Sequence, residues 1–206
     1  MKIETKKRKK QTKASKRVQS GLTRGSGGAL DSSQIKTAIL SHFRFELGWI
    51  YFSTEVSEWK ADILMIDPSE NLVEVEVKVS LADFKADFKK KKHEAYESPR
   101  GNEGVMPNKF YFAAPKSLEA GALSLMKERP LYGLLTVDES SGAVRTAKRA
   151  GLLNGRRGAG EKAKRVVVMR MGSELISLRR ERLAAGNPEF SAEEDVLDLA
   201  PYEIRD

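Results

Sequence analysis

Two acidic residues and a lysine, Asp62, Glu76 and Lys78, have the types and spacing needed for metal-assisted hydrolysis of a phosphodiester. Polar and apolar residues alternate over residues 72–79, so in a strand Glu74, Glu76 and Lys78 share one face. In such chemistry a metal lowers the pKa of a bound water, and a lysine orients that water or offsets developing negative charge. The alternative is an ordinary amphipathic strand with this face in water.

The preceding strand decides whether the two carboxylates meet. Residues 67–71 contain Asp, Pro, Ser and Asn, which are typical of turns. A five-residue hairpin loop there pairs Ile66 with Leu72 and places Asp62 opposite Glu76, whereas a register shift of one residue would separate them. Like charges in that position destabilise a sheet, and a hard cation between them removes the repulsion. We therefore expect a Mg²⁺ site, with Mn²⁺ as a substitute.

The stretch VEVEVKVSLADFKADFKKKKHEAY, with NKFYFAAP about a dozen residues later, resembles the MmcB-like group of DNA-repair proteins. Asp62 followed by Glu76-Val77-Lys78 also resembles the motif of the PD-(D/E)XK nuclease superfamily. The resemblance covers roughly residues 60–115 and implies a restriction-endonuclease-like core. It implies Asp62 and Glu76 as metal ligands, the Val77 carbonyl as a further ligand and Lys78 as the catalytic lysine.

Three more polar residues are candidates for accessory roles at this site. Glu55, at the end of the first predicted strand, and Glu46, in the first predicted helix, could each approach the metal. A surface charge is the simpler interpretation of both. Ser80 is interpreted either as a helix N-cap or as a hydroxyl close to the bound phosphate.

Basic residues are concentrated at the N-terminus. Residues 1–26 hold ten Lys or Arg and one acidic residue, in a chain of 206 residues with a net charge of +8. Because this segment has no apolar periodicity, we expect residues 1–28 to be a disordered arm. The arm either solubilises the protein or binds nucleic-acid phosphates. The binding interpretation assigns phosphate contacts to Lys6, Lys7, Arg8, Lys9 and Lys10.

A second basic segment, residues 145–165, has eight Lys or Arg and four interleaved glycines. This composition predicts a mobile loop, either along a phosphate backbone or as a surface insertion. Outside the arm, the residues that we expect to contact DNA are Lys89, Lys90, Lys92, Arg149, Arg156 and Arg157.

The predicted elements follow an order typical of an α/β domain with a mixed central sheet. Strands are predicted at residues 50–56, 60–66, 72–79, 109–113 and 131–137. Helices are predicted to begin at Ser32 or Ser33 and to cover residues 80–96, 117–128 and 161–184. Residues 29–186 would form the nuclease-like domain, and residues 187–206 an acidic C-terminal tail.

Composition excludes several other classes of protein. The chain has no cysteine and two histidines, which excludes disulfide scaffolds and disfavours zinc sites. No apolar run approaches the roughly 18 residues of a membrane span, and the N-terminus lacks the apolar core of a signal peptide. We therefore expect a soluble cytoplasmic protein with no membrane partner, in the host cytoplasm if it is phage-encoded.

The main hypothesis is a Mg²⁺-dependent nuclease that acts on duplex or branched DNA in repair, recombination or phage DNA processing. The alternative is a non-catalytic DNA-binding protein on a nuclease-like fold. Endonuclease action is expected, and resolution of DNA junctions would require a homodimer.

Overall fold

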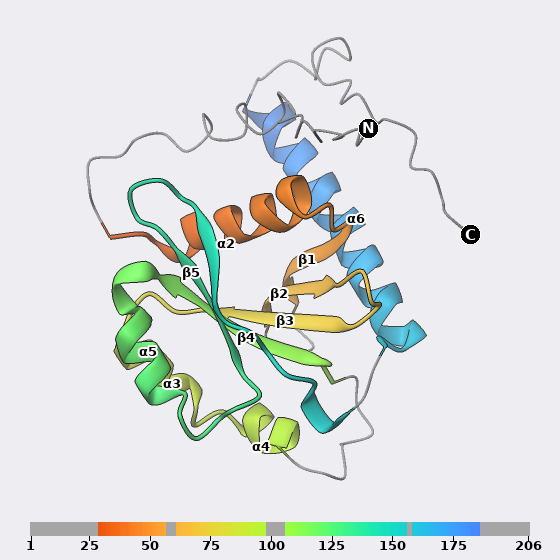
Figure 1. The fold of residues 1–206 in the computed structure, drawn as a ribbon. Coiled ribbons are helices and arrows are strands. Elements are labelled where there is room, and N and C mark those ends of the chain that lie inside the picture. Colours follow the sequence, from red (N-terminus) through yellow and green to blue (C-terminus); the bar gives the residue numbers. More distant parts are fainter. Residues whose placement is uncertain (1–28, 57–60, 98–105, 156–157, 186–206) are drawn as a thin grey trace, which may run out of the picture. The chain divides into compact units, whose positions relative to one another are not determined.

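The computed structural model describes residues 29–56, 61–97, 106–155 and 158–185 (Figure 1). The predicted arm with Lys6, Lys7, Arg8, Lys9 and Lys10 lies outside the described residues, as do Arg156, Arg157 and the acidic tail. The chain is divided into two compact units, Met1–Met171 and Gly172–Asp206. The first contains every strand found in the described residues.

The described residues form six strands, five α-helices and three shorter helical segments. The strands are β1 (Tyr51–Val56), β2 (Ala61–Ile66), β3 (Leu72–Val77), β4 (Lys109–Pro115), β5 (Gly133–Val137) and β6 (Val144–Lys148). The α-helices are α2 (Ser32–Ser41), α3 (Leu81–Asp87), α4 (Lys91–Glu97), α5 (Glu119–Leu125) and α6 (Glu161–Ala184). Shorter helical segments are the π-helical η2 (His42–Glu46) and the 3₁₀ turns η3 (Lys116–Leu118) and η4 (Leu153–Gly155).

The six strands form one mixed sheet in the order β1-β2-β3-β4-β5-β6. β1, β2 and β3 are antiparallel, β3, β4 and β5 are parallel, and β6 is antiparallel to β5. This mixed sheet with flanking helices confirms the predicted α/β class.

The prediction of a basic loop at residues 145–165 was wrong at both of its ends. Residues 145–148 belong to β6 and residues 161–165 begin α6. β6 is an edge strand, and edge strands tolerate exposed charged side chains such as Arg145. The basic side chains of β6 therefore led to the prediction of a loop, although the strand pairs with β5.

The predicted turn and register between β2 and β3 are confirmed. Leu64 pairs with Glu74 and Ile66 with Leu72. Asp67 Oδ1 accepts hydrogen bonds from the backbone N–H groups of Ser69 and Asn71, at 2.9 and 2.8 Å. These bonds fix the length of the turn, and turn length sets the register.

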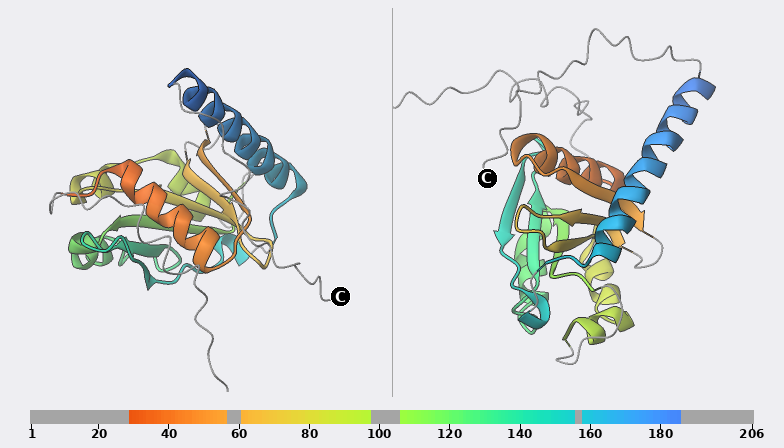
Figure 2. Two further views of the ribbon diagram at one scale, coloured as in Figure 1. Left: turned by 90° about the horizontal axis from the view of Figure 1, so that it is seen from above. Right: turned by 90° about the vertical axis from the view of Figure 1, so that its right-hand side faces the viewer.

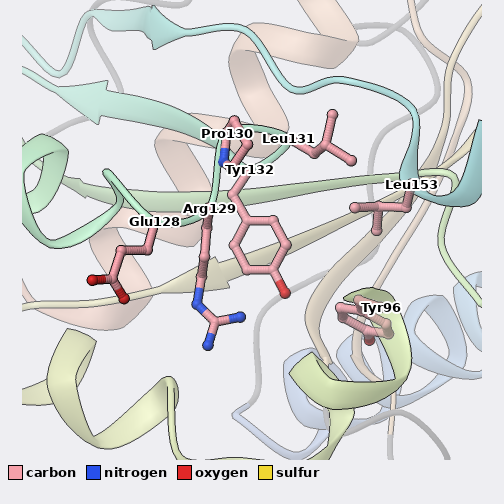
Figure 3. Close-up of a pocket in the computed structure, with 7 residues that line it drawn as sticks. All are labelled: Tyr96, Glu128, Arg129, Pro130, Leu131, Tyr132 and Leu153. Carbon is pink, nitrogen blue, oxygen red and sulfur yellow. The ribbon is translucent and has the colours of Figure 1, made fainter. Parts of the chain in front are cut away.

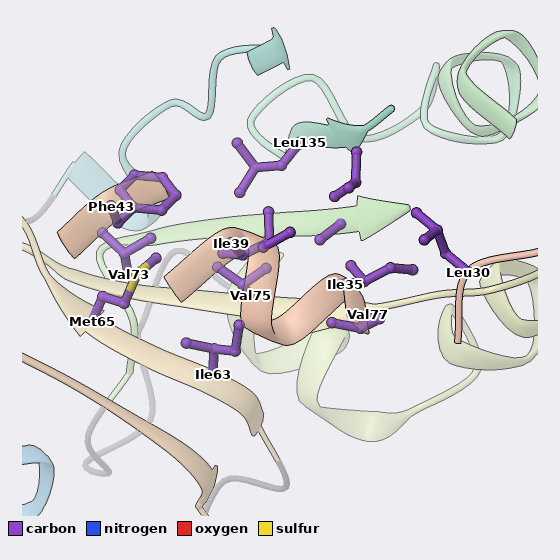
Figure 4. Close-up of a cluster of buried hydrophobic side chains, with 13 residues drawn as sticks. Leu30, Ile35, Ile39, Phe43, Ile63, Met65, Val73, Val75, Val77 and Leu135 are labelled. Carbon is purple, nitrogen blue, oxygen red and sulfur yellow. The ribbon is translucent and has the colours of Figure 1, made fainter. Parts of the chain in front are cut away.

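Apolar residues pack α2 against one face of the sheet. Ile35 and Ile39 of α2 and Phe43 of η2 contact the cluster that includes Val75 and Leu135 (Figure 4). The helix is capped by Asp31 rather than by Ser32 or Ser33. Asp31 Oδ1 accepts from Gln34 N–H at 2.8 Å, and Gln34 Oε1 accepts from Asp31 N–H at 2.9 Å.

The opposite face of the sheet carries two further apolar clusters. Ala163 and Val167 of α6 pack with Leu64, Ile66 and Leu72 of β2 and β3. Side chains of α3, α4 and α5 pack against β4 and β5. The right-hand view of Figure 2 shows α2 on one side of the sheet and α3 and α4 on the other. Between the two clusters, the face of β3 is polar.

The single helix predicted for residues 80–96 is two helices, α3 and α4. Ser80 caps α3 as expected, because its Oγ accepts from Asp83 N–H at 3.2 Å. Asp87 and His93 are both 1 % exposed. A spacing of six residues does not place two side chains on one face of a continuous helix, so the turn between the helices lets both point inward.

No helix in the described part of the chain is both long and apolar enough to cross a membrane.

Candidate active site

The polar face of β3 is buried. Glu74, Glu76 and Lys78, which directly follows the strand, are 0 %, 2 % and 6 % exposed. α3 and α4 supply the groups that cover them, so the alternative of an amphipathic strand with one face in water is wrong. Burial of three charges requires partners, because an isolated ion in a protein interior is very costly.

Lys78 lies between two carboxylates. Its Nζ is 3.0 Å from Glu76 Oε2 and 2.6 Å from Asp87 Oδ2. Burial alone lowers the pKa of Lys78, but the two carboxylates outweigh it and raise the pKa above its ordinary value. Lys78 is therefore a fixed, permanently charged ammonium group at neutral pH.

Two lysines of the 89–92 run bind the same carboxylates. Lys92 Nζ is 2.8 Å from Glu74 Oε1 and also pairs with Glu76 Oε1. Lys90 Nζ is 2.5 Å from Asp87 Oδ2 and 3.5 Å from Glu76 Oε2. Lys90 and Lys92 were predicted to contact DNA, but in this structure they bind carboxylates. Lys89, the third lysine of the run with this prediction, is exposed.

Asp87 is the second carboxylate of this group, and its role was not predicted from the sequence. His93 Nε2 lies 2.7 Å from Asp87 Oδ1, and His93 Nδ1 lies 2.9 Å from the Tyr132 hydroxyl. Burial raises the pKa of Asp87, but His93, Lys78 and Lys90 together lower it well below its ordinary value. His93, which no sequence motif singled out, is thus a buried partner of Asp87.

One signal in the sequence could have identified Asp87 as buried. It lies three residues after Phe84, which is fully buried, and residues at this spacing share a helix face.

Glu74 completes the group. Its Oε2 accepts a hydrogen bond of 2.5 Å from the Tyr96 hydroxyl. Burial raises the pKa of Glu74, although Lys92 and Tyr96 oppose this shift. We call the connected set the β3 network; its members are Glu74, Glu76, Lys78, Asp87, Lys90, Lys92, His93, Tyr96 and Tyr132.

Asp62 has different partners. Its Oδ2 accepts a hydrogen bond of 2.8 Å from the Val77 N–H, and its Oδ1 is 3.2 Å from Lys36 Nζ. Lys36 also pairs with Glu55. We call Lys36, Glu55 and Asp62 the α2 ion pairs. Glu55 is thus near Asp62, whereas Glu46 pairs with His42 at 3.0 Å.

The predicted site residues are therefore brought together only in part. The Asp62 carboxylate contacts the peptide that joins Glu76 to Val77, so both acidic residues lie at the carboxyl end of β3. However, the β2–β3 pairing ends at Ile63 and Val75, before Asp62 and Glu76 would face each other. Among the described residues, the ion pairs of Asp62 and those of Glu76 share no side chain, and no three acidic or histidine residues form a metal-binding group.

The remaining predicted residues are peripheral. Ser80 is engaged as the cap of α3. Arg149, just after β6, is exposed.

A hollow of about 160 Å³ borders the β3 network (Figure 3). Tyr96 and Tyr132 line it, and the Arg129 guanidinium lies 5.5 Å from the Tyr132 ring centre. The same two tyrosines hold Glu74 and His93. The hollow thus adjoins the side chains that support the buried charges.

The comparisons with known proteins identify a similar fold and no family. No protein-family profile matches the chain, and no curated protein matches its sequence. The structure of SPO1766, a protein of unknown function from Silicibacter pomeroyi, is similar with a TM-score of 0.52 and 18 % sequence identity. The match covers 78 % of this chain and 98 % of that chain. At this level of identity, the likeness concerns the fold alone.

Proposed function

We propose that this chain is a Mg²⁺-dependent deoxyribonuclease of the PD-(D/E)XK type, acting on duplex or branched DNA in repair, recombination or phage DNA processing. The observation that carries the proposal is the meeting of the motif at the end of β3. Asp62 Oδ2 binds the Val77 N–H at 2.8 Å, and Lys78 Nζ lies 3.0 Å from Glu76. Asp62, Glu76 and Lys78, chosen by type and spacing, and Val77, added by the resemblance, all lie at the carboxyl end of β3.

The donor chemistry fits a hard divalent cation. Mg²⁺ is commonly held by one or two carboxylates and keeps several of its waters, so it does not need a third acidic side chain. Asp62 and Glu76 would supply the carboxylates. The Val77 carbonyl would supply a further oxygen, since the N–H and C=O of one strand residue point to the same side. The Asp62 side chain is 24 % exposed, which gives solvent access to it.

A bound Mg²⁺ would supply an activated water and stabilise negative charge on the phosphate oxygens. The residues of the chain have complementary tasks. Lys78, held by Glu76 and Asp87, keeps its proton and offsets negative charge that develops on the phosphate. Lys89 and Arg149 are exposed cations that could hold the DNA backbone.

The position of the site in the sheet also supports the proposal. Lys78 directly follows β3, and β3 is parallel to β4. In α/β folds, ligands bind beyond the carboxyl ends of the parallel strands.

A second candidate function is a non-catalytic DNA-binding protein on the same scaffold. One observation favours it: Glu76 is 2 % exposed, and lysines pair with both of its carboxylate oxygens. Such a carboxylate serves chiefly to balance buried positive charge.

Cleavage assays separate the two functions. Wild-type protein, Asp62→Asn and Glu76→Ala are incubated with branched, single-stranded and duplex DNA, with Mg²⁺, Mn²⁺ or EDTA, at low and moderate salt. Glu94→Ala is the control, because Glu94 is an exposed carboxylate on α4. We expect metal-dependent cleavage that falls by about 100-fold or more in both site variants.

Asp62→Asn is the more informative variant, because its side chain is partly exposed and its replacement leaves the β3 network intact. Undiminished cleavage by both site variants would refute the site. Salt-sensitive binding by a wild-type protein that cleaves none of these substrates would establish the second candidate function.

A further inference from the structure

Asp87 is the partner of Lys78 that is held most firmly. Glu76, the other partner, is also bound by Lys90 and Lys92, and it is one of the two carboxylates assigned to the metal. Asp87 contacts Lys78 and Lys90 through Oδ2 and is anchored through Oδ1 by the rigid imidazole of His93 rather than by a flexible ammonium group. Its side chain is 1 % exposed.

The anchor of Asp87 has a definite direction. A carboxylate accepts hydrogen bonds, so the proton between Asp87 and His93 belongs to Nε2 of the imidazole. On the other side of the ring, His93 Nδ1 lies 2.9 Å from the Tyr132 hydroxyl. Burial raises the pKa of Tyr132 well above its ordinary value, which keeps this hydroxyl protonated. The imidazole is therefore held at both of its nitrogens, between Tyr132 and Asp87.

We infer that Asp87 is the positioning residue for Lys78, and that His93 and Tyr132 fix the orientation of Asp87. This inference rests on the proposed function of Lys78. A lysine ammonium is a compact charge on a flexible four-carbon stem, so a catalytic lysine needs a fixed partner. Asp87 supplies that partner without contacting the substrate. It comes from α3, whose start is fixed by the Ser80 cap only two residues after Lys78.

The activity test compares Asp87→Asn with Asp83→Asn, an exposed residue on the same helix. For Asp87→Asn we expect kcat to fall by about 10- to 100-fold, as for other residues that orient a reacting group, with little change in KM for DNA. His93→Gln retains a donor toward Asp87, so its loss should be smaller than that of His93→Leu. Asp83→Asn should match the wild type.

Two readouts separate positioning from a merely structural role. In a Lys78→Ala background, residual cleavage should not fall further when Asp87→Asn is added, because the residues act as one unit. The Lys78 ammonium group should also give a protected ¹H–¹⁵N signal, assigned with Lys78→Met. Asp87→Asn should abolish this signal while the backbone amide spectrum stays intact.

An unchanged kcat or an unchanged ammonium signal in Asp87→Asn would overturn the inference. Equal losses in the wild-type and Lys78→Ala backgrounds would overturn it as well. If the wild-type protein cleaves no DNA, the proposed function fails, and the ammonium spectrum still decides whether Asp87 holds Lys78.

Discussion

The two groups of charges near the end of β3 differ in their exposure to water. In the α2 ion pairs, the side chains of Lys36, Asp62 and Glu55 are 18 %, 24 % and 62 % exposed. In the β3 network, those of Lys78 and Glu76 are 8 % and 2 % exposed. The lysines of the two groups overlap in exposure, since Lys92 and Lys90 are 15 % and 43 % exposed, so the difference lies in the carboxylates. Only those of the first group can exchange their partners for water at low cost.

This difference in exposure suits the two groups to different roles in the proposed site. Exposed ion pairs contribute little to stability and rearrange readily, which suits a carboxylate that must accept a cation. Buried charges are costly to leave unpaired, which suits a lysine that must stay in place. In this interpretation Asp62 is the accessible ligand and Lys78 is the fixed cation.

The largest effect should come from removing a cation of the β3 network. Lys92→Met leaves Glu74 buried without its closest ammonium group, and breaking a buried pair from one side costs about 3 kcal/mol. Lys89→Met is the control, because Lys89 lies only three residues from Lys92 but is exposed, and it should leave the free energy of unfolding unchanged. Urea denaturation of both variants measures the difference. If Lys92→Met lowers the free energy of unfolding by less than about 1 kcal/mol, the buried pair stabilises the fold no more than an exposed ion pair does.

An intermediate effect is expected at alkaline pH. Burial alone lowers the pKa values of Lys78 and Lys92, but nearby carboxylates raise both above 10.5, and burial raises that of Tyr96. The folded protein therefore keeps protons that the unfolded chain releases. The stabilisation is complete below pH 10.5 for the lysines and is lost as the pH rises through their folded values.

Unfolding measured across this pH range checks the prediction. The free energy of unfolding should decline above pH 10.5 in the wild type and decline less steeply in Lys92→Met. Equal slopes for the two proteins would contradict the assigned linkage.

The smallest effect should come from the α2 ion pairs. Lys36→Met removes the partner of Asp62 and Glu55, yet it should change the free energy of unfolding by no more than about 1 kcal/mol, because these pairs are partly solvated. Thermal unfolding of Lys36→Met beside Lys92→Met tests the contrast directly. If the two variants are equally destabilised, exposure does not distinguish the groups.

Local patterns in the sequence were sufficient to predict much of the fold. The five predicted strands agree with β1 to β5 to within two residues at every end, because alternation and turn residues act over short distances. The register of β2 and β3 followed from the length of one turn. β6 was missed because its basic side chains, suited to an edge, do not resemble those of an interior strand.

The site was predictable only in its residue types. Asp62, Glu76 and Lys78 were chosen from spacing, but their partners come from α2, α3 and α4 and depend on how these helices pack. His93 had no motif, and its contact with Tyr132 spans 39 residues of chain. Such contacts depend on tertiary packing, so short-range sequence patterns do not predict them.

The link between His93 and Tyr132 has a consequence for motion. α4 has seven residues, fewer than a helix needs to persist by itself in water. Its order therefore depends on the buried side chains that tie it to β3 and to Tyr132, the residue before β5. Amide hydrogens of α4 should accordingly exchange with solvent together with those of the central strands, as one cooperative unit rather than as a fraying surface helix.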